Sequence, residues 1–422
     1  MYIVREVDKL ILKIMANKTI KTFFGLQLKV IGIRKQCTMP VRYLSNIKAA
    51  DLVVNTTNSP KPKPNVDPNE LVFGQHMADH MLLIEWSSKT GWKRPNILPF
   101  GSIPIQPSAS VLHYGLEVFE GLKAYRFDDG TVSMFRPDQN MQRLYNSAKR
   151  LSLPTFDRDE LLKCVSELIS IDQDWIPDAD NCSLYVRPTM IATEPSLGVK
   201  PPDSAMLFVI TGPVGPYFST GTFQAVSLLA DASFVRAWPG GIGDCKAGGN
   251  YGPTIYALKL AQSKGCSQCL WLYKNQVTEV GTMNFFMYWI NDAGEEELIT
   301  PPLNGLILPG ITRKSLLELA REWDEFKVTE KSFTIQDLAK AAEEGRVKEI
   351  FGAGTACVVC PIDKILYEDK YINIEAAHTI GFPVAKRFYD ELTDIQYGRK
   401  HHAWNYHVAK QNMKKVDPQT FQ

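Results

Sequence analysis

The stretch that most constrains the fold of this 422-residue chain is the glycine-rich segment 240–253, which holds a single lysine, Lys246. Its glycines let the backbone take positive φ angles and approach a ligand closely. The segment leads into a helical pattern from 255 to 261. A lysine held in place with its ammonium partly desolvated loses basicity and becomes a nucleophile towards carbonyls. The segment therefore predicts a reactive lysine; the alternative is a surface lysine in a flexible loop.

Composition excludes several classes of protein. With 45% hydrophobic and 22% charged residues the chain has a normal globular balance, and its length suits two domains. The net charge of +1 gives no electrostatic reason to expect a nucleic-acid partner. No apolar run is long enough to predict a membrane span. Eight cysteines do not form a disulfide framework and fit a reducing compartment.

The first 48 residues differ from the rest and predict a mitochondrial targeting segment. The first 50 residues contain ten Lys or Arg and two acids, and no acid occurs between Lys9 and Ala50. Apolar residues alternate with the lysines, as in transit peptides. Few serines and more lysines than arginines leave a basic tail on a cytoplasmic protein as the alternative. The Pro- and Asn-rich region that follows predicts a linker over 49–70.

The order of strand and helix patterns predicts a mixed α/β chain with two domains. Strands are expected near 81–86, 184–188, 205–211, 223–230, 269–273, 277–280 and 285–290. Helices are expected over 136–151 and 158–171, after 310 and after 334. The Gly/Pro cluster 212–216 marks the boundary. We predict a small N-terminal domain over 71–213, an interdomain loop over 214–222, a large cofactor-binding domain over 223–400 and a tail over 401–422.

Three features have the chemistry of a phosphate or ring-nitrogen site. Gly310-Ile311-Thr312 begins a helix, where free N–H groups favour an anion, and Gly352-Ala353-Gly354-Thr355 offers small residues and a hydroxyl. Glu279 lies in a strand between β-branched residues, where it is either exposed or buried beside a positive group. Taken singly, the first two are also explained as a helix cap and a tight turn. The helical wheel of 136–151 places Arg143 opposite the apolar face, as a solvated side chain.

Two Cys-x-x-Cys pairs, Cys266/Cys269 and Cys357/Cys360, leave several interpretations open. Together they outline a four-thiolate zinc site, but the 87-residue gap and the strand-like runs argue against it, so no metal is predicted. Cys357/Cys360 follows a glycine-rich turn and suits a redox pair. Two buried apolar thiols are the alternative.

A lysine, a carboxylate and a phosphate cradle are together what pyridoxal 5'-phosphate requires. With these features, the chain resembles the branched-chain amino acid aminotransferases, which have fold type IV. The resemblance covers roughly residues 66 to 400. The segments that carry the resemblance are Phe119–Ala124, Ser183–Thr189, Glu194–Val199, Gly243–Lys246, Thr278–Asn284 and Gly354–Cys360.

The resemblance implies a function and a cofactor site. The function is reversible transfer of the amino group of leucine, isoleucine or valine to 2-oxoglutarate, by a ping-pong mechanism with pyridoxal phosphate. Lys246 would form the Schiff base and move the proton, Tyr251 would bind the phenolic oxygen, and Glu279 would pair with the ring nitrogen. The residues expected to hold the phosphate are Arg143, Ile311, Thr312 and Thr355, which overrules the solvated reading of Arg143.

The resemblance also implies a substrate pocket at the interface of a homodimer. The pocket residues from the same chain would be Phe73, Phe119, Tyr185, Arg187, Tyr217, Thr282 and Ala356. Those from the partner subunit would be Tyr114, Leu197 and Val199 of the neighbouring copy. Cys357 and Cys360 match a regulatory redox pair of the animal enzymes. The expected partners are small amino acids and 2-oxo acids, with no nucleic acid and no membrane.

Two rival functions remain at this point. One is another type IV activity, such as a D-amino acid aminotransferase or an aminodeoxychorismate lyase; Tyr185-x-Arg187 and the 354–360 segment argue against both. The other is a catalytically silent scaffold, which would have no need of Lys246, Tyr251 and Glu279 together.

Overall fold

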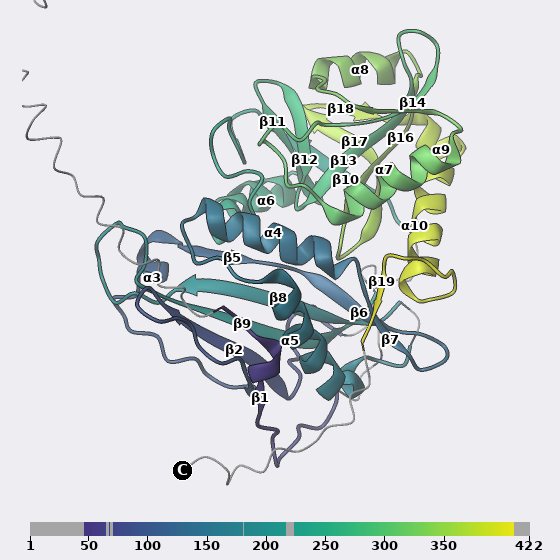
Figure 1. The fold of residues 1–422 in the computed structure, drawn as a ribbon. Coiled ribbons are helices and arrows are strands. Elements are labelled where there is room, and N and C mark those ends of the chain that lie inside the picture. The colour runs from purple at the N-terminus through teal and green to yellow at the C-terminus, as the bar shows by residue number, and fades with distance from the viewer. Residues whose placement is uncertain (1–45, 65–66, 68–70, 180, 217–222, 409–422) are drawn as a thin grey trace, which may run out of the picture. The chain divides into compact units, whose positions relative to one another are not determined.

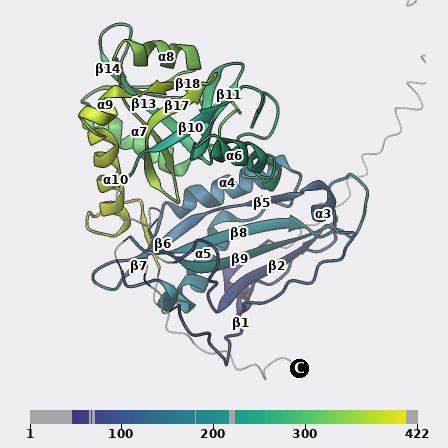
Figure 2. The ribbon, with the colours of Figure 1, turned by 180° about the vertical axis from the view of Figure 1, so that it is seen from behind.

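A computed structural model describes residues 46–64, 67, 71–179, 181–216 and 223–408, and the predicted targeting segment lies almost wholly outside them. The first half of these residues, together with one strand near the C-terminal end, builds a ten-stranded sheet (Figures 1 and 2). Its order is β1 (Val53–Val54), β4 (Asn96–Pro99), β2 (His80–Ser87), β9 (Ser204–Val214), β8 (Ser183–Ala192), β6 (Leu122–Arg126), β7 (Val132–Phe135) and β19 (Asn405–His407), with β3 (Gly91–Trp92) beside β2 and β5 (Glu117–Phe119) beside β8.

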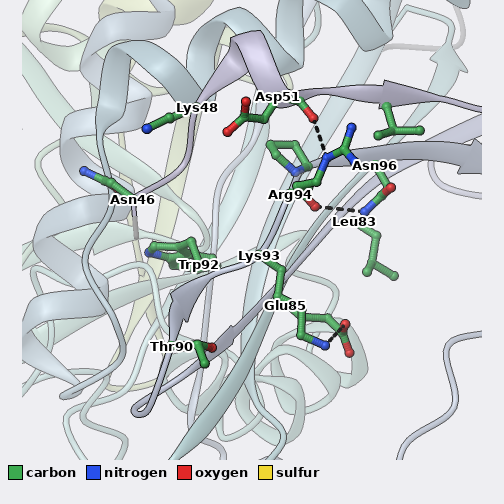
Figure 3. A pocket seen from close by; sticks show the side chains of 12 residues that line it. Asn46, Lys48, Asp51, Leu83, Glu85, Thr90, Trp92, Lys93, Arg94 and Asn96 are labelled. Atoms are coloured by element: carbon green, nitrogen blue, oxygen red, sulfur yellow. Dashed lines mark hydrogen bonds and ion pairs between the residues drawn. The ribbon is translucent and has the colours of Figure 1, made fainter. Parts of the chain in front are cut away.

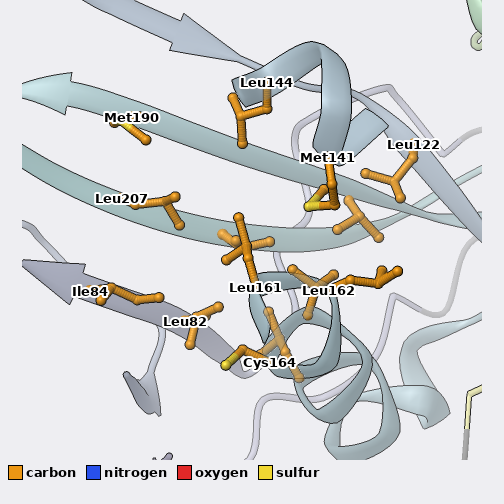
Figure 4. Packing of buried hydrophobic residues seen from close by; sticks show 14 of the residues in the cluster. Leu82, Ile84, Leu122, Met141, Leu144, Leu161, Leu162, Cys164, Met190 and Leu207 are labelled. Atoms are coloured by element: carbon orange, nitrogen blue, oxygen red, sulfur yellow. The ribbon is translucent and has the colours of Figure 1, made fainter. Parts of the chain in front are cut away.

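Two helices cover this sheet and supply its core. These are α4 (Pro137–Arg150) and α5 (Arg158–Ile171). Helix α5 begins where predicted, because the Asp157 side chain accepts hydrogen bonds from the N–H groups of Asp159 and Glu160. The apolar faces of both helices pack onto strand residues around Leu82, Ile84 and Leu207 (Figure 4). Helix α4 lies between this sheet and the second group of strands (Figures 1 and 2).

The second group of strands is a nine-stranded sheet that closes on itself. Its order is β12 (Gln276–Val280), β11 (Gln268–Tyr273), β10 (Val226–Ala230), β17 (Val358–Tyr367), β16 (Val347–Gly354), β13 (Met283–Ile290), β14 (Glu296–Thr300) and β15 (Lys327–Glu330), with β18 (Lys370–Asn373) beside β17. An additional pairing of β12 with β13 closes a ring of strands. The alternating burial of an open sheet is therefore lost: β13 and β16 are buried on both faces.

Helices surround this ring: α6 (Thr254–Ser263), α7 (Ile311–Trp323), α8 (Ile335–Glu343), α9 (Glu375–Thr379) and α10 (Pro383–Gln396). Helix α8 begins after residue 334, as predicted, with a capping box of Thr334 and Asp337, and Gly345 at φ +68° follows its end. The mixed α and β architecture predicted from the sequence is confirmed.

Two segments join the first sheet from outside the predicted small domain. Strand β19, in the predicted tail, pairs with β7. In the stretch predicted as a linker, Val53–Val54 pairs with β4, and the Thr57 N–H donates to Nε2 of His80. Neither attachment has a signal in the sequence, since a two- or three-residue strand has no detectable period.

Candidate active site

The lysine loop is fastened to the first sheet through its backbone. The Phe119 N–H donates to the Lys246 carbonyl (2.9 Å), and Val118 forms an isolated bridge with Ala247. The Lys246 N–H donates to the Ser147 hydroxyl of α4 (3.0 Å). A Cβ on Gly248 would lie 1.7 Å from a Glu117 carboxylate oxygen, so any larger residue at this position would displace the Glu117 side chain. The predicted interpretation of a lysine in a flexible surface loop is therefore wrong.

The Lys246 side chain lies in a nearly closed environment. Its ammonium donates to the Tyr251 hydroxyl (3.0 Å) and lies 4.8 Å from the centre of the Phe119 ring. Burial, followed by the nearby Arg143 cation, lowers the pKa of Lys246 from 10.5 to about 8. Burial also raises the pKa of Tyr251 to about 12, so the phenol stays protonated. The site thus holds an amine that loses its proton easily, beside a phenol that does not.

Glu279 is buried on β12, not on an exposed alternate position of the strand. One carboxylate oxygen accepts from the Leu308 N–H (2.8 Å) and the Asn284 amide (3.1 Å), and the other pairs with Nε of Arg236 (2.8 Å). Burial raises the pKa of Glu279, and Arg236 counteracts part of that rise. The carboxylate is fixed in a dry site with a cationic partner.

The start of α7 has the features of an anion site. Its N-cap is Gly310, and no side chain caps the helix, so the first N–H groups and the helix dipole favour a negative ligand. A Cβ on Gly310 would meet the Asn284 side chain at 1.9 Å. Asn284 also binds Glu279, so one side chain shapes both features. Ile311 and Thr312 are buried at this end of the helix.

Arg143 reaches the same place from α4. Its guanidinium binds the Glu120 carboxylate through two hydrogen bonds (2.7 and 2.8 Å) and donates to the carbonyl of Pro309 (3.1 Å), next to the α7 start. Arg143 is 7% exposed and Glu120 is 0% exposed. The wheel-based prediction of a solvated Arg143 is wrong, because a second layer of structure covers the outer face of α4.

Replacing Arg143 with alanine should destabilise the protein strongly. The change leaves the Glu120 carboxylate buried without its cation, which typically costs about 3–5 kcal/mol. Arg150→Ala is the control on the same helix, because Arg150 binds only loop carbonyls at the surface. Urea unfolding of both variants would measure the difference. Equal midpoints for the two would contradict the importance of the buried pair.

Aromatic side chains and one arginine form a cluster beside the lysine. The Phe73 ring packs edge-on against Tyr185 (4.8 Å), and the Phe119 ring lies 5.0 Å from that of Tyr251. Arg187 donates to the Tyr185 hydroxyl (3.0 Å) and lies over the Phe119 ring (4.8 Å). The Nε of Arg187 is buried and has no hydrogen-bond partner among the residues that the structure describes. Five predicted site residues from distant segments are thereby brought together next to Lys246.

The predicted pocket residues are not all enclosed, since Phe73 is 53% exposed. Thr282 and Ala356 are exposed, and Thr355 is half-buried, all at turns between strands. Tyr217 lies outside the described residues. Tyr114, Leu197 and Val199 lie on the surface with 40%, 63% and 83% exposure, and the Tyr114 hydroxyl donates to the Leu197 carbonyl. The roles of all these residues stay predictions.

Four site residues were not predicted from the sequence. Arg236, Asn284 and Glu120 hold Glu279 or Arg143, and Ser147 holds the lysine backbone. Glu120 and Asn284 stand within the motifs that carry the resemblance, which was an available signal. Arg236 and Ser147 had none, because their partners are far away in the sequence.

The cysteines lie in two different clusters. Cys266 and Cys269 pack in one hydrophobic cluster and Cys357 and Cys360 in another, and all four are free thiols. Burial raises the pKa of Cys357 to about 12 and also raises that of Cys360. No group of three or more His, Cys, Asp or Glu side chains with the arrangement of a metal site occurs within the described ranges.

One well-defined pocket belongs to a different surface. It has a volume of about 580 Å³ and lies beside β2 and β3, among residues such as Lys48, Glu85, Trp92 and Arg94 (Figure 3). None of the predicted site residues lines it. In the part of the chain that the structure describes, no helix is long and apolar enough to cross a membrane.

Pyridoxal 5'-phosphate needs an amine, an acid at the ring nitrogen and an anion site. The site offers all three, as the half-buried Lys246 of low basicity, the fixed Glu279 carboxylate and the uncapped start of α7. The fold and site thus define the class of pyridoxal-phosphate-dependent transferases. Residues 117–365 match the family described as amino-transferase class IV.

Individual proteins give the same result. The chain is 57% identical to the cytosolic branched-chain-amino-acid aminotransferase of Mus musculus over 359 residues, covering 85% of this chain and 92% of that protein. It is 54% identical to the mitochondrial form of Rattus norvegicus over 379 residues, covering 89% and 96%. The Escherichia coli enzyme structure superposes with a TM-score of 0.62 at 26% identity, covering 74% of this chain and 97% of that one. The chain therefore belongs to the class IV aminotransferases, among the branched-chain-amino-acid aminotransferases.

Proposed function

We propose that this protein transfers the amino group of leucine, isoleucine or valine to 2-oxoglutarate, giving the branched-chain 2-oxo acid and glutamate in a ping-pong reaction. The observation that carries the proposal is the half-buried Lys246 ammonium beside the Tyr251 hydroxyl, with the Phe119 ring packed against Tyr251. Family membership supports the same activity.

The chain's own residues suit the proton transfer that this reaction needs. When bound, pyridoxal phosphate supplies a carbonyl that condenses with the substrate amine and a ring that accepts the Cα electrons. Lys246, with its pKa lowered to about 8, takes the proton from Cα and returns it to the other reaction centre. Glu279 would keep the ring nitrogen protonated, and Tyr251 would bind the phenolic oxygen. Arg143, Ile311, Thr312 and Thr355 would hold the phosphate.

One pocket would bind both the branched-chain substrates and the pair glutamate and 2-oxoglutarate. The rings of Phe73, Phe119 and Tyr185 favour branched aliphatic side chains, whose burial is worth about 25 cal/mol per Å². Arg187, whose buried Nε has no partner, would bind the γ-carboxylate of glutamate and 2-oxoglutarate. Tyr217, Thr282 and Ala356 would complete the pocket.

The exposed apolar side chains of Tyr114, Leu197 and Val199 support a homodimer in which each copy closes the other's pocket. The Val199 side chain is 83% exposed, so the fold of one copy buries little of its apolar surface. Contact with a second copy would remove that surface from water, which is favourable.

The relatives include cytosolic and mitochondrial forms at similar identity. Location in the mitochondrion is proposed on the basic, acid-free N-terminal segment.

Cys357 and Cys360 are proposed as a redox pair. The raised pKa of both thiols implies slow oxidation of the resting protein, because the thiolate is the reactive form.

An absorbance titration would test the proposed function. Protein loaded with pyridoxal phosphate should show a visible band that leucine moves towards the near ultraviolet and 2-oxoglutarate restores, because the two half-reactions share one site. D-leucine is the control. A band that responds to D-leucine instead would favour the D-amino acid enzymes, and the absence of any band would favour a silent scaffold.

A further inference from the structure

Lys123 is a half-buried lysine that the proposed mechanism does not use. It lies on β6, opposite Tyr185 of β8, and its ammonium donates to the carbonyl of Ala356 (3.0 Å). The acceptor lies on the turn between β16 and β17. One side chain of the first sheet therefore holds a turn of the second.

The environment of Lys123 lacks an acidic partner among the described residues. No carboxylate there forms an ion pair with it, and the titratable groups that affect its pKa are the thiols of Cys357 and Cys182. A cavity of about 210 Å³ beside it is lined by residues that include Lys386 and Tyr389 but, within the described part, no Asp or Glu. Burial lowers the pKa of Lys123 to about 8. Because Lys123 is half-buried and has no carboxylate partner among the described residues, an apolar side chain of similar length should cost the fold little stability.

The turn that Lys123 holds is strained. Val358 has φ +62°, a left-handed conformation that β-branched residues strongly avoid. The Val359 N–H donates to the Cys357 carbonyl (2.8 Å), so residues 357–359 form a γ-turn with a positive central φ, a rare conformation. Such a conformation persists only when the surroundings hold it. The hydrogen bond from Lys123 to the Ala356 carbonyl is one such restraint. It also fixes the Cys357 N–H, because this N–H and the Ala356 carbonyl belong to one planar peptide unit.

We propose that Lys123 is a positioning residue, which holds the Ala356 carbonyl and thereby keeps the strained turn in the conformation that presents Thr355 and Ala356 to cofactor and substrate. The inference rests on the proposed function for the roles of those two residues. Lys123 itself does not touch the reacting atoms. Its charge is retained because an ammonium binds a carbonyl more strongly than a neutral donor does.

Steady-state kinetics of Lys123→Met would test the proposal. The variant keeps the length of the side chain and removes the donor, so the KM values for leucine and 2-oxoglutarate should rise, by about tenfold to 100-fold. The kcat should change little, because the turn binds substrate and transition state alike. Lys123→Arg, which keeps a charged donor, should recover most of the affinity. Lys386→Met is the control, since Lys386 lines the same cavity but pairs with Asp390.

A second measurement separates this inference from the proposed function. Hydrogen exchange of the cofactor-free protein should be faster across 355–359 in Lys123→Met and unchanged in Lys386→Met, whatever reaction the enzyme catalyses. The thermal stability of Lys123→Met should not fall. Unchanged exchange at 355–359 with unchanged KM values would overturn the inference, as would a loss of stability and kcat with KM intact. A wild-type protein without transamination would refute the proposed function, while the exchange result would still decide the role of Lys123.

Discussion

Lys246→Ala is expected to lower the rate of transamination by at least about 10⁴-fold, the upper range for loss of a positioned proton-transfer group. The amine lies beside the Tyr251 hydroxyl, with a pKa lowered to about 8. Its backbone is fixed independently by Phe119 and Ser147, so the loop should keep its place without the side chain. Activity assays with leucine and 2-oxoglutarate, together with the visible absorption of the loaded protein, would measure the loss.

The same variant has a measurable effect on stability. In the cofactor-free protein Lys246 has a pKa of about 8 instead of 10.5, so between these pH values the unfolded chain binds more protons than the folded one. The free energy of unfolding of the wild type therefore rises with pH in this window, and the rise should be smaller in Lys246→Ala. Lys264→Ala, which removes an exposed lysine, is the control. If Lys246→Ala kept its transamination activity, the assignment of Lys246 as the proton-transfer group would be wrong.

Glu279→Gln should lower the rate by about 10²–10³-fold while the protein still binds the cofactor. Glutamine has nearly the same shape and can keep a hydrogen bond from the Leu308 N–H, but it carries no charge to stabilise a protonated ring nitrogen. Losing one preorganised electrostatic group typically has an effect of this size. Turnover and cofactor content, measured on the same preparation, would separate chemistry from binding.

Glu279→Ala is the harsher variant and tests a different consequence. It leaves the Arg236 guanidinium buried without its carboxylate, at a typical cost of about 3–5 kcal/mol. Its midpoint of urea unfolding should therefore fall well below that of Glu279→Gln. Glu297→Gln is a reference, since that buried carboxylate accepts from Trp289 far from the lysine loop. If Glu279→Gln kept wild-type turnover, the proposed role of the carboxylate would be excluded.

Local features of the sequence were sufficient to predict the elements that depend on neighbouring residues. The Asp157 cap, the capping box of Thr334 and the helix after Gly310 need only residues a few positions apart, so their physics is visible in the sequence. The same holds for part of the glycine pattern around Lys246, since Gly240 has a φ of +81° and a Cβ on Gly243 would lie 2.6 Å from the Gly305 carbonyl oxygen. The lysine, the carboxylate and the helix start were therefore identified as chemistry before their arrangement was known.

Only the tertiary structure decided which of these groups face one another. Arg143 is on the outer face of its helix and becomes buried because α7 and its preceding loop cover that face. Glu279 pairs with Arg236, and Lys123 reaches Ala356 across more than 200 residues of sequence. A helical wheel or a strand period records one element's exposure and carries no information on what packs against it. The chemistry of the site was thus determined by residue type, whereas its geometry and its pKa values arise from burial by segments that are distant in the chain.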